Sequence, residues 1–133
     1  MIGMYKEWGW LPKWELYGRE TFTMEGDPAI PVIVDTWMKG LRDFDMDAAY
    51  EAMRKSATTP GSQNRMRPDI DPYVEKGYVP LGFYARDLSG DNSVSHALEY
   101  YIADHALSLL ADSLGRREDA ALFRNRSLGY KNY

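Results

Sequence analysis

The 133-residue chain contains no cysteine, which excludes disulfide frameworks, thiolate zinc sites and cysteine nucleophiles. It also lacks long apolar runs, so the sequence predicts no membrane-spanning helix. A signal peptide is not visible, because the charged residues Lys6 and Glu7 stand where its apolar core should be. The chain has no excess of basic side chains either. The 16 basic and 20 acidic side chains give a net charge of −4, which argues against binding to a nucleic-acid backbone.

Several catalytic and metal-binding motifs are also absent. The two histidines, His96 and His105, are nine positions apart and would point to opposite sides of a helix, so they cannot share a metal ion there. No His-x-x-x-His pair, glycine-rich phosphate loop or Gly-x-Ser-x-Gly elbow occurs in the sequence. Zinc hydrolases, nucleotide-binding proteins and serine hydrolases therefore receive no support.

Three alternating aspartates, Asp43, Asp45 and Asp47, resemble the beginning of a calcium-binding loop. The rest of that pattern fails, because Ala48 stands where glycine is needed and Arg54 where the bidentate glutamate belongs. Aspartates also stabilise the first turn of a helix. We therefore interpret these residues as a helix N-terminus, with Asp45 as its cap.

Aromatic residues are abundant, at 14% of the chain, with 4 Trp and 10 Tyr. Three of the tryptophans fall between Trp8 and Trp14. Because Trp and Tyr combine a flat apolar face with a polar group, they suit a protein core, an interface or a sugar site. A hydrophobic fraction of 44% and a charged fraction of 27% are typical of a globular domain.

Hydrophobic spacing predicts an all-α chain of four or five helices joined by long loops, with almost no strand. Asp27 and Pro28 would begin a helix that Gly40 ends, and Gly115 would end another. An irregular loop is expected over Trp8–Met24. The expected helices are Met1–Lys6, Ile30–Leu41, Met46–Ala57, Ser93–Leu114 and Arg116–Tyr133, and a second loop is expected over Thr58–Pro72, followed by one turn at Tyr73–Lys76.

The helix predicted over Ser93–Leu114 is apolar all round, which is typical of a buried helix. Glu99 falls in one of its apolar sectors, and a lone buried carboxylate is costly unless it is paired or changes its pKa. Two interpretations stay open. Glu99 is either a residue of a functional site or the structural partner of an arginine such as Arg86 or Arg126.

The segment from Trp10 to Asp27 combines aromatic rings, acids, a lysine and an arginine on a backbone rich in glycine. Aromatic faces stack on the C–H surface of sugars, while carboxylates and arginines bind neighbouring hydroxyls. This composition is compatible with a site for neutral sugars.

Several short blocks follow one another along the whole chain: Tyr5–Trp14, Glu20–Thr21, Met24–Pro28, Asp35–Gly40, Asp45–Met53, Gly77–Pro80, Ser93–Tyr100 and Leu114–Asn132. In this order they resemble glycoside hydrolase family 92, the calcium-dependent exo-acting α-mannosidases. Two departures are Trp8, where the family usually has glycine, and Pro28, where histidine is common.

This resemblance implies that residues 1–133 are part of an (α/α)6 barrel, without an internal domain boundary, in a longer enzyme that also has an N-terminal β-sandwich. Family members are usually exported. They invert the anomeric configuration with an acid and a base roughly 6.5–9.5 Å apart, and they use Ca²⁺. The family's catalytic and calcium-binding motifs align after Tyr133, so no catalytic or metal-binding residue is assigned here.

We expect this chain to supply a wall of the substrate site, with Trp14 stacking on the sugar and with Glu20 and Asp27 accepting hydroxyl hydrogen bonds. The expected partners are a mannose-containing glycan, the rest of the barrel and the β-sandwich, and the isolated chain should be inactive. Two alternatives remain: a stand-alone helical module that binds carbohydrate or protein, and a barrel hydrolase of another sugar. The expected substrate-binding residues are Trp14, Glu20, Thr21, Met24, Asp27 and Glu99.

Overall fold

The computed structural model describes residues 1–83 and 92–133, and helices dominate there, as the sequence predicts. None of the described helices is both long and apolar enough to cross a bilayer. The elements are α1 (Ile2–Trp8), β1 (Glu15–Leu16), β2 (Arg19–Glu20), α2 (Ala29–Met38), α3 (Met46–Thr58), the 3-10 turn η1 (Gly61–Gln63), α4 (Ile70–Lys76), α5 (Ser93–Ser113), α6 (Arg117–Ser127) and the 3-10 turn η2 (Leu128–Asn132).

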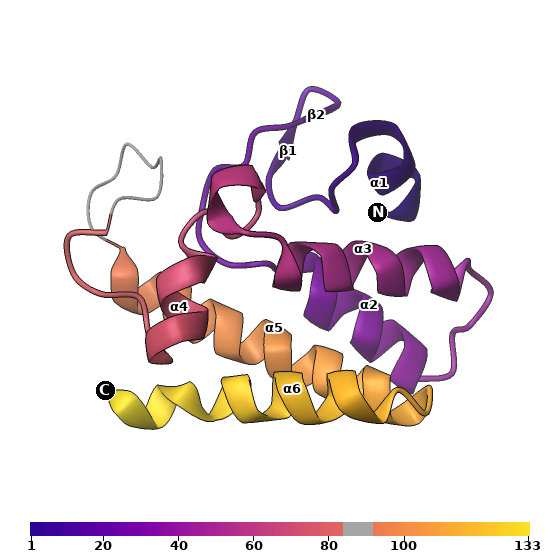
Figure 1. Cartoon of the computed structure of the whole chain (residues 1–133). Coiled ribbons are helices and arrows are strands. Elements are labelled where there is room, and N and C mark those ends of the chain that lie inside the picture. The colour runs from indigo at the N-terminus through magenta and orange to yellow at the C-terminus, as the bar shows by residue number, and fades with distance from the viewer. Residues whose placement is uncertain (84–91) are drawn as a thin grey trace.

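The four longer helices form two antiparallel hairpins that lie against each other. Helices α2 and α5 run in the same direction, while α3 and α6 return beside them (Figure 1). The first residues of α2 and of α5 therefore lie toward the same end of the hairpins (Figure 1). This arrangement is consistent with part of an (α/α)6 barrel.

Two groups of buried side chains hold the elements together. The larger group joins the four hairpin helices and includes Ile30, Met53, Leu107 and Phe123, none of which is exposed. The smaller group packs α4 and the following loop against the first half of α5. Its members are Ile70, Tyr73, Val79, Ala97, Tyr100 and Tyr101.

Helix α5 is only half covered, so the prediction of a fully buried helix was wrong for this chain. Its inner side, with Tyr100 and Leu107, is completely buried. The opposite side carries an apolar stripe that the described residues leave about half exposed. Its members are Val94, Leu98, Ile102 and Leu109, which are 50%, 45%, 55% and 42% exposed.

The segment Trp8–Met24 is more regular than predicted. Helix α1 continues to Trp8 and ends at Gly9, whose φ of +78° closes the last turn. Tyr17 and Gly18, with φ of +50° and +72°, connect the strands β1 and β2. Two successive positive φ angles are the signature of a tight hairpin turn. Gly18 therefore permits a hairpin inside the segment that we expected to be irregular.

Helix boundaries differ from expectation by a few residues. Asp45 caps α3 as predicted, and its Oδ1 atom accepts a hydrogen bond of 3.0 Å from the Ala48 N–H. Helix α2 ends at Met38 instead of Leu41, before Gly40 with a φ of +84°. Helix α4 starts earlier than the predicted turn because Pro72 fits its first turn, where the missing N–H costs nothing. The last helix begins at 117 and loosens into η2 after 127.

Candidate functional site

The loop between α1 and α2 is closed by the carboxylate of Glu20. Its oxygens accept hydrogen bonds from the backbone N–H groups of Lys13 at 2.6 Å, Trp14 at 2.9 Å and Phe22 at 2.7 Å. Hydrogen bonds from N–H groups to a charged carboxylate are stronger than those between neutral groups. Glu20 therefore joins both ends of the hairpin, and its oxygens are turned toward the backbone of its own loop.

Backbone strain is concentrated just after this contact. Phe22 and Met24 have φ of +57° and +69°, a region that side chains other than glycine rarely adopt. Thr21 supports the same turn through a 2.7 Å hydrogen bond from its hydroxyl to the Trp14 carbonyl. Strained residues persist where the surrounding contacts hold them, and they cluster at functional sites.

The expected substrate-binding residues fall into two groups. Trp14, Thr21 and Met24 present free surface, with Trp14 50% and Met24 48% exposed. Glu20 and Asp27 Oδ2 instead accept hydrogen bonds from within the protein, and Asp27 Oδ1 is buried without a hydrogen-bond partner among the described residues. The first group is available to a ligand, while the second supports the loop.

Asp27 begins a network of buried charges that the sequence analysis missed. Its Oδ2 atom accepts hydrogen bonds from Ser56 Oγ at 2.6 Å and Arg67 Nε at 3.0 Å. Arg67 also donates from Nη1 to Asp104 at 2.7 Å, and Arg126 donates to the same carboxylate from Nε at 2.8 Å. Although burial opposes the charge of Arg67, the two aspartates raise the pKa of its guanidinium, so it stays protonated. The network joins the entrance of α2 to α5 and α6.

A third buried acid, Asp69, lies beside this network toward the start of α5. It accepts a 2.6 Å hydrogen bond from the Tyr100 hydroxyl and lies 2.6 Å from His96 Nδ1. Burial, with Asp69 beside it, raises the pKa of Tyr100 well above its usual value. His96 is therefore bound to a carboxylate, while His105 on the same helix is exposed.

Lys13 approaches this network from the loop. Its ammonium group donates a 2.8 Å hydrogen bond to the Met66 carbonyl. Burial lowers the pKa of Lys13, and the nearby Asp27 and Asp69 partly offset that effect. Lys13 thus ties the loop to the chain before α4, whereas the hydrogen bonds of Glu20 stay within the loop.

Glu99 is exposed, so its expected position in a buried apolar sector was wrong. Arg126 contacts Asp104 instead of Glu99, and Arg86, the other suggested partner, lies outside the described residues. Glu99 nevertheless packs on the loop, because a Cβ atom added to Gly26 would lie only 2.6 Å from Glu99 Cβ. Gly26, with φ of +81°, thus lets the loop lie directly on α5 beside Glu99.

The described residues do not fit a calcium site. No group of three or more His, Asp or Glu side chains in ranges 1–83 and 92–133 could hold a metal ion. Of the three alternating aspartates, Asp45 caps α3 and forms a 2.7 Å ion pair with Lys6, while the Asp47 side chain is almost fully exposed. Calcium needs several converging oxygen ligands, and the described part of the chain does not bring them together.

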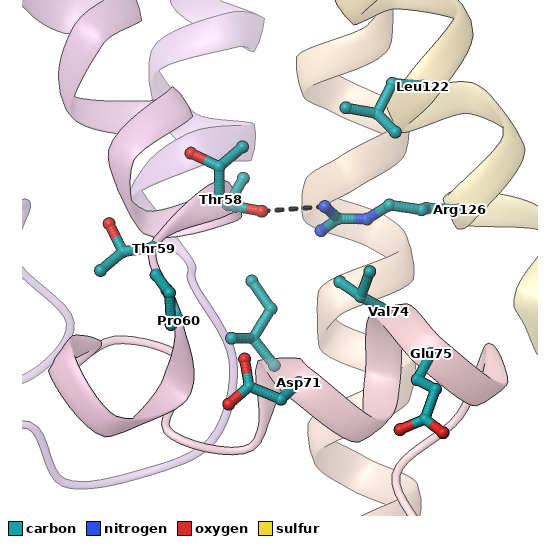
Figure 2. A pocket seen from close by; sticks show the side chains of 10 residues that line it. Thr58, Thr59, Pro60, Asp71, Val74, Glu75, Leu122 and Arg126 are labelled. Carbon is teal, nitrogen blue, oxygen red and sulfur yellow. Dashed lines mark hydrogen bonds between the residues drawn. The ribbon is translucent and has the colours of Figure 1, made fainter.

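A separate hollow of about 370 Å³ lies between the end of α3, η1, α4 and α6. Figure 2 shows Arg126 at its side, with its guanidinium turned toward the end of α3, where Nη1 donates to the Ala57 carbonyl at 2.9 Å. Asp71, also in the lining, accepts a hydrogen bond from the Gly61 N–H. Because these polar groups already have protein partners, this hollow is a weaker candidate than the loop.

The helical hairpins and the loop that lies on α5 agree with the family that the sequence blocks resemble. Residues 1–133 match the model of the glycosyl hydrolase family 92 catalytic domain over their whole length. The chain belongs to glycosyl hydrolase family 92. A fungal relative described as an uncharacterized secreted glycosidase, from Arthroderma benhamiae, is 31% identical over 124 residues, which cover 90% of this chain and 16% of that protein.

Solved structures of family 92 enzymes share the fold of the chain. An inverting family 92 mannosidase from Bacteroides thetaiotaomicron superposes with a TM-score of 0.86 at 28% identity, covering 98% of this chain and 17% of its own. A family 92 α-mannosidase from the same organism, in complex with mannoimidazole, gives a TM-score of 0.83 at 35% identity, covering 98% and 16%. The family 92 chain described here thus spans about one sixth of the length of these relatives.

Proposed function

We propose that this family 92 chain is a segment of an inverting α-mannosidase, in which it forms one wall of the site that binds the terminal mannose. The observation that carries the proposal is the contact between Gly26 and Glu99, which places the loop before α2 on the first half of α5. Trp14, Met24 and Glu99 are left with free surface. The structural relatives, which are family 92 mannosidases, support the choice of sugar.

In this proposal some residues of the wall contact the sugar and others hold the loop in place. Trp14 stacks on the apolar face of the sugar. Glu99 and Thr21, whose hydroxyl proton already goes to the Trp14 carbonyl, accept hydrogen bonds from the sugar hydroxyls. Glu20 and Asp27 hold the loop in position from within, which revises the roles expected for them from the sequence. Preorganised loops improve binding because fewer groups must be ordered when the ligand arrives.

The catalytic acid and base lie outside this chain in our proposal, as do the ligands of the Ca²⁺ ion that the family resemblance implies. An inverting mechanism needs a proton donor on the leaving oxygen and a base that activates water on the opposite face of the sugar. The apolar stripe on α5 would then be covered by the remaining barrel helices, and the complete enzyme would be exported. A stand-alone module would need that stripe covered by its own residues.

The complete gene product tests this proposal. We expect it to hydrolyse aryl α-mannosides faster than the matching α-glucosides and α-galactosides, with β-mannose as the first product seen by proton NMR. Calcium chelation should remove this activity, and residues 1–133 alone should have none. Faster hydrolysis of another aryl glycoside would favour the alternative barrel hydrolase, and release of α-mannose would contradict inversion.

Variants of the loop test the wall. Trp14→Ala should lower kcat/KM on an aryl α-mannoside by about tenfold or more, since it removes the stacking surface. Tyr17→Asn is the matched control, because Tyr17 is 96% exposed at the tip of the hairpin and asparagine tolerates its positive φ. Equal effects of both substitutions would argue against a specific role for Trp14.

A further inference from the structure

A cleft of about 510 Å³ opens between α1, the β1–β2 hairpin and the chain around residue 65. Its volume falls in the range of about 300–1,000 Å³ that is usual for small-molecule sites. The cleft lies on the hairpin side of Glu20, and none of the other expected sugar-binding residues lines it. The lining side chains are Glu7, Trp8, Arg19, Glu20, Phe22 and Arg65.

One part of the lining is a stacked pair of side chains. The guanidinium carbon of Arg65 lies 3.9 Å from the centroid of the Phe22 ring. Phe22 is held in its left-handed conformation by the 2.7 Å hydrogen bond from its N–H to Glu20. Because an arginine stacked on a ring keeps the donors at its edge free for other partners, Arg65 is a preorganised donor at this cleft.

The other charged groups of the lining also keep their hydrogen-bonding capacity. Arg19, Arg65 and Glu7 make no side-chain hydrogen bond or ion pair with any residue in the described ranges. The two guanidinium groups offer several N–H donors each, and the Glu7 carboxylate offers acceptors. Trp8 adds an aromatic surface that is only partly covered.

Charge selects among possible ligands. The lining carries two arginines and two glutamates, so its formal charge is zero. The cleft therefore has no net positive charge to attract an anion such as a phosphate. Donors, acceptors and aromatic rings together match a neutral polyol with C–H faces and hydroxyl groups. We propose that this cleft is a subsite for a neutral hexose unit of the glycan, distinct from the terminal mannose that is removed.

This inference rests on the proposed function, since Glu20 contributes both to the loop of the proposed mannose wall and to the cleft. The test compares substrates in the complete gene product. Arg65→Ala should raise KM for a linear mannotriose about tenfold and leave kcat/KM for an aryl α-mannoside within twofold, because the small substrate does not reach the cleft. Arg65→Lys keeps the charge but loses the planar fork of donors. Its KM for mannotriose should lie between that of the parent protein and that of Arg65→Ala.

The matched control is Arg42→Ala. Arg42 also stacks on an aromatic ring, with its guanidinium carbon 4.5 Å from the Trp37 centroid, but it lies away from the cleft. Its substitution should therefore change neither KM for mannotriose nor kcat/KM for the aryl α-mannoside. Thermal melting of each variant reports whether it folds. The subsite would be overturned if Arg65→Ala weakened the turnover of both substrates equally. It would also be overturned if Arg65→Ala left KM for mannotriose unchanged.

Direct titration separates this inference from the proposed function. A non-hydrolysable thio-linked mannotriose should bind the Arg65→Ala variant about tenfold more weakly than the parent protein in isothermal titration. If the parent hydrolyses no mannoside but shows this difference, the proposed function fails and the cleft remains a glycan site. If hydrolysis is normal and both proteins bind the thio-linked sugar equally, only the subsite fails.

Discussion

Nη1 of Arg67 lies 2.7 Å from Oδ1 of Asp104, and neither side chain is exposed to solvent. The contact joins the chain before α4 to the middle of α5, and Arg67 continues to Asp27 at the start of α2. Removal of one partner from such a buried pair leaves an uncompensated charge, which costs more than the pair itself contributes. This arginine therefore connects three segments that are distant in sequence.

Arg67→Met should lower the free energy of unfolding by about 3–5 kcal/mol, because Asp27 and Asp104 lose their common partner while remaining buried. Denaturant unfolding measures the change. The double variant Arg67→Met/Asp27→Asn should lose less than the sum of the single variants, since the second change removes the carboxylate that is left without its ion-pair partner. Lys39→Met, which breaks an exposed ion pair with Asp35, serves as control and should cost less than about 1 kcal/mol.

Glu20→Gln should loosen the loop, because the amide replaces one acceptor oxygen with a donor that faces backbone N–H groups. The hydrogen bonds lost are to a charged acceptor, so a cost of about 1–3 kcal/mol is expected. Near-ultraviolet circular dichroism of the neighbouring Trp14 and the kcat/KM of the complete protein both report the change. Glu15, the cross-strand partner of Glu20, is exposed, and Glu15→Gln should leave both measurements unchanged.

Gly26→Ala should displace the loop from α5, since the new methyl group would lie 2.6 Å from Glu99 Cβ at a φ of +81°. Gly18→Ala has a similar positive φ, but nothing lies within 4 Å of the added carbon. The difference in melting temperature between the two variants therefore isolates the contact from the backbone strain, which costs about 1–2 kcal/mol at either site. If the two alanine variants were destabilised equally, Gly26 would be needed only for its positive φ and not for the close contact with Glu99.

The buried tyrosines should make the protein sensitive to alkali. Burial and the adjacent Asp104 raise the pKa of Tyr73, and burial and Asp69 raise that of Tyr100, above the ordinary value of 10.0. The unfolded chain then releases these protons first, so stability is fully present below about pH 10 and falls as pH rises above it. Tyr73→Phe should flatten the decrease in melting temperature between pH 9.5 and about 11.5. Titration of tyrosinate absorbance provides an independent check, and an unchanged slope would contradict the assignment.

Elements of the fold with local causes could be predicted from the sequence. Helix α3 follows from its apolar spacing and the Asp45 cap, and α5 ends one residue short of its predicted last residue, just before the turn at Gly115. The hairpin was missed because its strands contain two residues each, too few for any alternation to be visible. The turn at Tyr17 and Gly18 was its only local signal, and positive φ at a tyrosine is uncommon.

The polar interior could not be predicted, because nothing local marks a buried charge. Arg67 lies in a segment whose prolines and glycine indicate a loop, and charged loop residues are usually exposed. Asp104 falls on a helix side that becomes polar only through its contacts with Arg67 and Arg126. Glu99 was misplaced for the converse reason, since a helical projection shows which neighbours are apolar and says nothing about whether another element covers them.

The stripe of Val94, Leu98, Ile102 and Leu109 has a practical consequence for anyone who prepares residues 1–133 in isolation. About half of each side chain is in contact with water, and aliphatic surface of this kind drives self-association. Such a preparation should elute earlier from a sizing column as its concentration rises, and mild detergent should reverse the shift. Charged replacements along α5 would then be the first remedy for poor solubility.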